Sequence, residues 1–230
     1  MLVRVCVQVE VQLKFKLKEE TLFLAIHILD RFLERRLVSR TKLQLVGCTS
    51  LLLAAKYEEI YAPEVADFVA ISDKAYAREQ IIAMEGIMLN ALSFNLTVPL
   101  PINFLQRFAR LGGVEQGDQV WCLAMYFMEL TLQSYAFLNF PPSQIAASAL
   151  YLAMGTAQQA MGLGHLPVWT HTQSSQIEYT PSQLQGCLTE MFKLVEHTQN
   201  GLSKYKAVKK KYTLPKFHEV AKYTCRAPVF

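Results

Sequence analysis

Apolar residues recur every three or four positions along most of the chain, which is the spacing of helices that bury one face. Two such stripes are Leu22, Ala25, Ile26, Leu29 and Leu33, and Trp121, Ala124, Met125, Met128 and Leu132. Neither segment alternates apolar and polar residues as a half-buried strand would. The segment from Leu43 to Ala55 is apolar on every face, so we expect a central helix that other helices surround. The pattern predicts an all-α protein.

The helical pattern repeats along the chain. The two stripes lie 99 residues apart, and at the same offset the segments 47–54 and 146–153 match, small residues against small and large against large. A third pair of apolar segments follows at an offset of 106 residues. Two copies of one helical domain explain this spacing most simply.

The junction between the copies is predicted at Thr97–Pro101, where two prolines within three residues forbid a continuous helix. We therefore assign residues 1–97 to a first domain, 98–215 to a second and 216–230 to a C-terminal tail. Thr180-Pro181-Ser182-Gln183 has the hydroxyl, proline and Gln of a capped helix start, and Pro141-Pro142 precedes another helix. The valine-rich run 2–9 looks more strand-forming than helical.

Composition fits a folded protein. Hydrophobic residues make up 52% of the 230 positions, enough for one large core or two cores of roughly 100 residues each. Neither a membrane-spanning run nor a secretory signal pattern is present in the sequence. The five cysteines show no C-x-x-C spacing and mostly lie in apolar runs, so we interpret them as reduced, buried intracellular thiols.

Positive charge is concentrated near the C-terminus. Residues 204–230 hold eight Lys or Arg and one acidic residue, although the whole chain has a net charge of only +4. Five lysines have tyrosines interleaved among them: Lys204, Lys206, Lys209, Lys210 and Lys211. A solvated final helix is the commoner meaning of this composition, while phosphate-backbone contact and nuclear import remain open.

Two charges next to apolar helical runs are the leading site candidates. Lys56 ends one such run and Glu85 interrupts another, and charges so close to a core need a partner. If the two helices pack side by side, the pair would suit binding the backbone of another protein's helix. Judged on its spacing alone, Lys56 would more often be a cation that complements the macrodipole at a helix C-terminus.

Enzymatic and metal sites are not indicated. The five histidines form no H-x-x-x-H pair, and none neighbours a cysteine at ligand spacing. Gly162-Leu163-Gly164 lacks the third glycine of a dinucleotide loop, and no Gly-x-Ser-x-Gly elbow or pair of clustered acids suggests hydrolysis. We expect no metal, no cofactor and no catalytic residue.

Several spaced motifs together resemble the cyclins, specifically the B-type mitotic group. The resemblance covers roughly residues 9–223, and the C-terminal segment is closest to the third B-type subgroup. The motifs are Ile28-Leu29-Asp30-Arg31-Phe32-Leu33, 42–47, Ala55-Lys56-Tyr57-Glu58-Glu59, Pro63-Glu64-Val65, Met84-Glu85 and 140–147. The resemblance implies tandem cyclin boxes, two five-helix repeats each around a central apolar helix.

By the same resemblance, the chain is an activating subunit of a mitotic cyclin-dependent serine/threonine kinase and transfers no phosphate itself. Lys56 and Glu85 match the family's pair that binds the kinase's mobile helix. We expect Tyr57, Glu58 and Glu59 to belong to the same kinase-binding surface. Glu58 and Glu59 could instead form a solvated helix end. Asp30 and Leu45 match signature positions of the first box, and we interpret Asp30 as structural. Control of the G2/M transition, in nucleus and cytoplasm, is the implied setting.

The family's substrate-recruiting patch is altered in this chain. Counting back from Lys56 places Val7 where the family has tryptophan, Arg4 at a leucine and Met1 at the arginine that would pair with Asp30. Glu10 and Gln44 match polar members of the patch. We therefore expect a weakened groove for Arg-x-Leu peptides of kinase substrates, and we interpret the difference as a truncated or divergent N-terminus.

Two other functions compete with kinase activation. A transcription factor similar to TFIIB would bind DNA with the same tandem fold, but it should show a zinc ribbon and basic helices in both repeats. A cyclin-like scaffold that no longer activates a kinase is the second rival. Confinement of the basic residues to the tail argues against nucleic acid as the partner, and we expect no membrane association.

Overall fold

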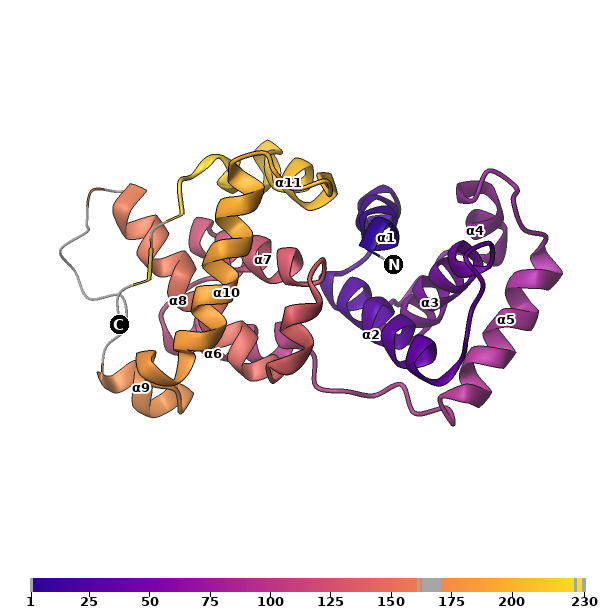
Figure 1. Cartoon of the computed structure of the whole chain (residues 1–230), viewed down its shortest axis with the longest axis horizontal. Helices are drawn as coiled ribbons and strands as arrows, with labels where there is room; N and C mark the ends of the chain where they lie inside the picture. The colour runs from indigo at the N-terminus through magenta and orange to yellow at the C-terminus, as the bar shows by residue number, and fades with distance from the viewer. Residues whose placement is uncertain (1, 161, 163–170, 226, 229–230) are drawn as a thin grey trace. The chain divides into compact units, whose positions relative to one another are not determined.

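The structure is a computed structural model that describes residues 2–160, 162, 171–225 and 227–228 (Figure 1). These residues form α-helices and short 3₁₀ helices and contain no β-strand. Packing divides the chain into two compact units, residues 1–100 and 101–230. The predicted all-α fold is therefore confirmed.

The first unit consists of five helices. They are α1 (Leu2–Phe15), α2 (Glu19–Arg35), α3 (Leu43–Glu58), α4 (Val65–Ile71) and α5 (Arg78–Ala91). Helix α3 contacts each of the other four. Its residues are buried without a break from Ser50 to Ala55, because they are apolar or small on every side. The predicted central helix is thus α3.

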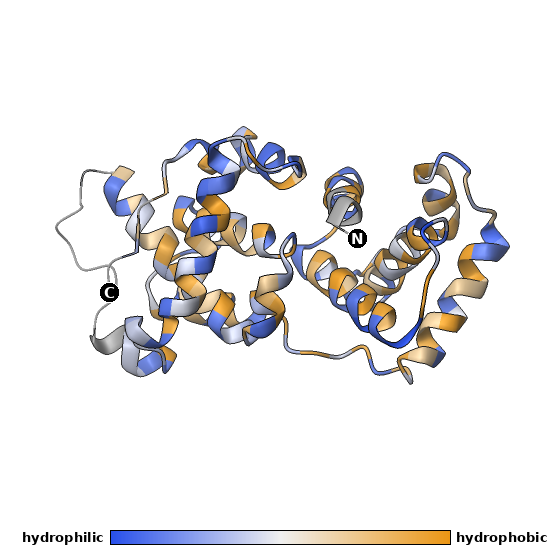
Figure 2. Ribbon diagram, viewed as in Figure 1, coloured by the Kyte–Doolittle hydropathy of each residue, from blue (hydrophilic) through white to orange (hydrophobic). Residues whose placement is uncertain are grey.

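The second unit repeats this arrangement. It contains α6 (Pro101–Leu111), α7 (Gln119–Thr131), α8 (Pro142–Ala160), α9 (His171–Ile177), α10 (Pro181–Gln199) and α11 (Ala207–Tyr212), with 3₁₀ turns η1 (Tyr135–Asn139), η2 (Pro215–Phe217) and η3 (Val220–Lys222). Helix α8 contacts α6, α7 and α10, so it holds the central place that α3 holds in the first unit. Figure 2 shows hydrophobic residues distributed along the helices of both units.

Helix boundaries follow local signals in the sequence. Pro101 opens α6, so the helix begins at the second of the two junction prolines. At α10 the backbone N–H of Thr180 donates to Gln183 Oε1 at 2.8 Å, and the Gln183 N–H donates to Thr180 Oγ1 at 3.4 Å. This reciprocal pair is a capping box, with Pro181 in the first turn, as predicted.

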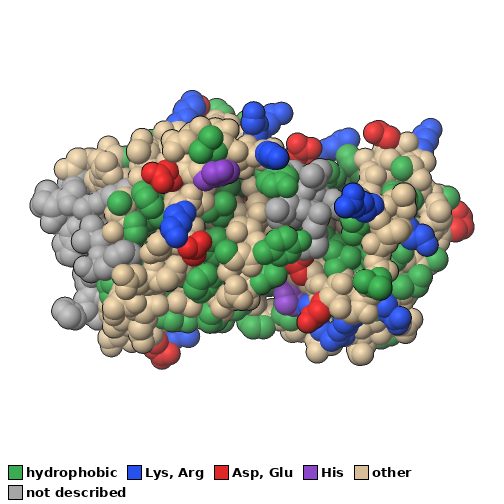
Figure 3. All heavy atoms as spheres, in the orientation of Figure 1, with side chains coloured by type: hydrophobic (Ala, Val, Ile, Leu, Met, Phe, Trp, Pro, Cys, Tyr) green, Lys and Arg blue, Asp and Glu red, His purple; other side chains and the backbone are tan. Residues whose placement is uncertain are grey.

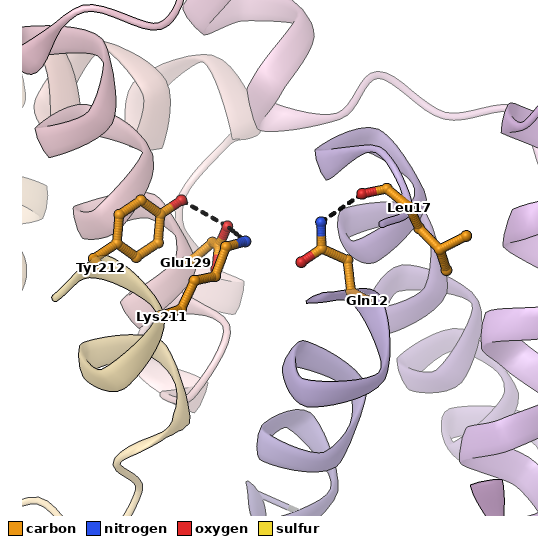
Figure 4. A network of polar contacts seen from close by, with 5 residues as sticks. All are labelled: Gln12, Leu17, Glu129, Lys211 and Tyr212. Carbon is orange, nitrogen blue, oxygen red and sulfur yellow. Dashed lines mark hydrogen bonds and ion pairs between the residues drawn. The ribbon is translucent and has the colours of Figure 1, made fainter. Parts of the chain in front are cut away.

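The expectation of strand character in residues 2–9 was wrong, because α1 begins at Leu2. Helix α1 packs on α2 and α3, and it buries Gln8, Val9, Val11 and Gln12 at helical spacing while Val7 and Glu10 are exposed. Burial of that face outweighs the weak β preference of valine. Gln12 Nε2 also donates to the Leu17 carbonyl at 2.6 Å, closing the turn after the helix (Figure 4).

A buried ionic network fastens α11 to α7. Lys211 Nζ lies 2.5 Å from Glu129 Oε1, and the Tyr212 hydroxyl donates to the same oxygen at 2.8 Å (Figure 4). The side chains of Lys211 and Glu129 are both fully buried. Lys211 therefore does not belong to a solvated helix face, in contrast to the commoner interpretation of the lysine cluster.

Removing one partner of this network should destabilise the second unit strongly. We expect Lys211→Met to lower the free energy of unfolding by about 3–5 kcal/mol, because it leaves a buried carboxylate without its cation. Tyr212→Phe deletes only one hydrogen bond and should cost about 1–2 kcal/mol. Urea denaturation would measure both. The double change Glu129→Leu/Lys211→Met should recover part of the loss, and equal losses in the single and double variants would contradict the ion-pair account.

Candidate functional site

Lys56 and Glu85 form the ion pair that the sequence suggested. Lys56 lies in the last turn of α3 and Glu85 lies on α5, and the two helices are in contact. Lys56 Nζ donates to both carboxylate oxygens, at 2.6 and 2.9 Å. The lysine side chain is 46% exposed and the glutamate side chain 14%. The pair is therefore fixed in position while almost half of the lysine side chain stays accessible.

Large apolar side chains close to this pair in sequence are exposed. Tyr57, Ile60 and Tyr61 follow Lys56 in sequence, and they are 49%, 84% and 93% exposed. Ile82 lies one turn before Glu85 on α5 and is 41% exposed. We call Lys56, Glu85 and these four residues the α3–α5 face. A fixed charge pair among exposed aromatic and branched residues is typical of a protein-binding surface.

Glu59 points back into the first unit. Its Oε1 accepts hydrogen bonds from the Lys18 backbone N–H at 2.7 Å and from Thr21 Oγ1 at 2.5 Å. Lys18 is the N-cap of α2 and has no capping side chain of its own. The Glu59 carboxylate therefore accepts the hydrogen bond of a backbone N–H at the start of α2, although it lies far from that helix in the sequence. The sequence did not reveal this role.

Glu58 and Tyr57, the two residues before Glu59, form hydrogen bonds with different parts of the first unit. Lys18 Nζ donates to the Glu58 carbonyl at 2.7 Å, and burial together with repulsion from Glu20 raises the pKa of the Glu58 carboxyl. The Tyr57 hydroxyl shares a 2.6 Å hydrogen bond with Thr97 Oγ1. Of the five residues predicted to bind a kinase, Lys56, Tyr57 and Glu85 belong to the α3–α5 face, whereas Glu58 and Glu59 engage the region around the start of α2.

Of the signature residues Asp30 and Leu45, Leu45 is buried in the first unit and Asp30 is half-buried. Leu45 is 5% exposed on α3. Asp30, on α2, has no hydrogen-bond or ion-pair partner among the described residues, and burial raises the pKa of its carboxyl to about 6. Its neighbour Arg31 donates to the Asn95 carbonyl at 2.7 Å. Asp30 is thus a half-buried carboxylate that has no cation paired with it in the described part of the chain.

The altered patch around Val7 is a small hollow between α1, α3 and α4. Val7 and Gln44 line it, together with Gln8, Gly47, Cys48 and Phe68, whereas Glu10 is exposed elsewhere on α1. Its volume is about 30 Å³, enough for one or two water molecules. The weakness of a groove for Arg-x-Leu peptides stays a prediction, which this small volume supports. Met1 and the side chain of Arg4 lie outside the described residues.

Gln8 was not identified from the sequence, although it shapes this hollow. Its Nε2 donates to the Gly47 carbonyl at 3.2 Å and to Ser50 Oγ at 2.9 Å. Ser50 Oγ already donates to the Gly47 carbonyl, so the amide nitrogen must face Ser50. Gln8 Oε1 is consequently left buried and without a hydrogen-bond partner among the described residues.

No group of three or more His, Cys, Asp or Glu side chains is placed to hold a metal ion in the described part of the chain. Within the same residues, none of the helices has both the length and the apolar character that crossing a bilayer requires.

Comparison with known families agrees with this geometry. The model of the cyclin N-terminal domain matches residues 5–97, and the model of the cyclin C-terminal domain matches residues 99–226. The chain belongs to the cyclin family. The tandem cyclin boxes that the motifs implied are therefore confirmed.

The relatives of this cyclin are B-type. It is 43% identical to the G2/mitotic-specific cyclin-B2 of Oryzias latipes and 45% identical to the G2/mitotic-specific cyclin-B of Marthasterias glacialis. Each match covers 93% of this chain, and 53% and 52% of the two relatives. The chain thus spans about half the length of the curated relatives it matches. The B-type resemblance is confirmed, and the finer likeness to the third subgroup stays a prediction.

Solved structures show the same fold. A viral cyclin from herpesvirus saimiri superposes with a TM-score of 0.61 at 17% identity, over 84% of this cyclin and 88% of the viral chain. A chain of the CAK complex of Chaetomium thermophilum, bound to ATP-gamma-S, gives a TM-score of 0.61 at 20% identity, over 99% of this chain and 72% of the other.

The raised pKa of Asp30 predicts a specific pH dependence of stability. Between the ordinary value of 3.8 and the folded value of about 6, the folded state holds a proton that the unfolded state releases. Stability due to this group is therefore present below about pH 4 and is lost as the pH rises through 6. Asp30→Asn removes the titration, so this variant should be more stable than the parent at pH 7.5 by about 1–2 kcal/mol, and nearly equal to it at pH 4.

Urea titrations at both pH values would test this dependence. Glu34→Gln, which changes an exposed carboxyl on the same helix, should show no pH-dependent difference from the parent. An Asp30→Asn variant that is less stable than the parent at pH 7.5 would mean that the ionised carboxylate has a partner.

Proposed function

We propose that this cyclin is the regulatory subunit of a mitotic cyclin-dependent serine/threonine kinase, and that the α3–α5 face binds the kinase. The observation that carries the proposal is the bidentate Lys56–Glu85 pair, accessible and flanked by exposed Tyr57 and Ile60. The names of its relatives, which are G2/mitotic-specific cyclins, support a role in that phase of the cell cycle.

The mechanism of such a subunit is allosteric. An ammonium and a carboxylate held side by side can bind the backbone groups at the start of a kinase helix and in the loop before it. Docking that shifts this helix inward completes the kinase's own Lys–Glu ion pair and moves its activation segment off the active site. Moving a kinase from almost wholly inactive to almost wholly active takes about 5.5 kcal/mol of differential binding. An interface of roughly 2,000 Å² or more can supply it.

Reconstitution with a monomeric cyclin-dependent kinase tests the proposal. We expect the chain to stimulate histone phosphorylation, and Lys56→Ala/Glu85→Ala to raise the concentration needed for half-maximal stimulation at least tenfold, since hot-spot residues each contribute about 2 kcal/mol or more. The pair is partly solvated, so its own contribution to folding stability is small and the variant should remain folded.

The control is Glu190→Ala/Lys193→Ala, which removes a second surface ion pair of 2.8 Å in the other unit. This variant should stimulate the kinase as the parent does. Stimulation that survives the Lys56/Glu85 change would exclude the α3–α5 face. Binding to the kinase without stimulation would favour the scaffold function.

A further inference from the structure

A basic pocket lies in the second unit where the end of α10 meets α11. Its volume is about 460 Å³. The residues that line it include Ser203, Tyr205, Lys206, Lys209, Lys210 and Thr213. No acidic residue is among its lining residues. A concave site with three lysines and no carboxylate has a positive potential that attracts anions.

Lys206 and Lys210 are available to a ligand. Both side chains are exposed, and neither has an ion-pair partner among the residues that the structure describes. Lys193 and Lys222 in the same unit differ, because each pairs with a glutamate three residues before it. Figure 3 shows Lys and Arg side chains grouped over the region that α11 occupies in Figure 1.

Lys209 is held in place by the end of α10. Its Nζ donates to the carbonyls of Thr198 and Gln199, at 3.2 and 3.3 Å. These carbonyls belong to the last turn of the helix, where a cation also complements the macrodipole. An ammonium group has three donors, so one remains for a ligand in the pocket. Lys209 thus supplies a positioned charge beside the two exposed lysines.

The serine and threonine hydroxyl groups of the pocket wall form hydrogen bonds with the backbone. Ser203 Oγ donates to the Tyr205 carbonyl at 3.3 Å and accepts from the Tyr205 N–H at 3.2 Å, and Thr213 Oγ1 donates to the Lys210 carbonyl at 2.8 Å. These bonds order the segment before α11 and the residue after it. The N–H groups of the three lysines are therefore the main hydrogen-bond donors that the pocket offers to a ligand.

We propose that this pocket binds the phosphate group of a phosphorylated serine or threonine side chain in a partner protein. A phosphomonoester carries a charge of about −1.5 to −2 near neutral pH, which two or three lysines can neutralise. Lysine binds phosphate as a point charge. A nucleic acid would instead need cations spaced along a groove that follows successive phosphates, whereas these lysines converge on one hollow. The site is separate in sequence from the α3–α5 face, so the proposal does not rest on kinase activation.

The test uses the full chain and a short blocked peptide whose only charged group is one phosphoserine, with fluorescence anisotropy at 150 mM salt as the readout. We expect the phosphorylated peptide to bind and its unphosphorylated twin not to bind. Inorganic phosphate should compete. Lys206→Ala/Lys210→Ala should weaken binding at least tenfold, while Lys193→Ala/Lys222→Ala, which removes the same charge from paired lysines, should change it less than twofold.

Three outcomes would overturn the proposal. The first is that the phosphopeptide does not bind at millimolar concentration, and the second is that the two double variants weaken its binding equally. The third is that a 20-base-pair duplex or phosphatidylserine vesicles bind more tightly than the peptide, in a way that depends on Lys206 and Lys210. Circular dichroism of both variants would establish that they are folded. Kinase stimulation by Lys206→Ala/Lys210→Ala should equal that of the parent, so the two functional proposals can fail independently.

Discussion

A helix that is apolar on every face is stable in water only when other helices surround it. Helix α3 imposes this constraint on the first unit, where α1, α2, α4 and α5 all contact it. From Thr49 to Ala55 the helix is buried without a break, and Lys56 is the first exposed residue after that run. Lys56 lies in the last turn, immediately after the buried run that ends at Ala55, so the position of the charge pair follows from the packing of the core. The α3–α5 face therefore lies where the C-terminal end of the central helix reaches the surface of the first unit.

Two Lys–Glu pairs that join separate helices among the described residues differ in environment and therefore in role. Lys211 and Glu129 are fully buried, and Tyr212 shares the same carboxylate oxygen. Such a pair contributes little over a well-packed apolar alternative, but breaking it is costly, so it fixes where α11 lies on α7. Lys56 is almost half exposed, and its pair contributes little to stability. An accessible pair that stability does not require is free to serve binding.

Features set by neighbouring residues could be predicted from the sequence, whereas most features set by distant residues could not. The capping box of α10 lies within four residues, and the central character of α3 is visible in its own composition. In contrast, the partner of Lys211 is 82 residues away, and Glu59 reaches back 41 residues to Lys18. The pairing of Lys56 with Glu85, 29 residues apart, could be predicted because Lys56 ends one apolar helical run and Glu85 interrupts another. Helix α1 was misassigned because tertiary burial overrode the preference of its valines.

Polar groups on both α1 and α2 lack partners among the described residues. Gln8 Oε1 on α1 is buried without a hydrogen bond, and the half-buried Asp30 carboxyl on α2 has no hydrogen-bond or ion-pair partner in that part of the chain. Burial costs Gln8 Oε1 the hydrogen bonds that water would make, and it raises the pKa of Asp30 because the charged carboxylate is less well solvated than in water. At the α3–α5 face, by contrast, Lys56 and Glu85 satisfy each other. These unpartnered groups therefore lie on α1 and α2, and none of them belongs to the α3–α5 face.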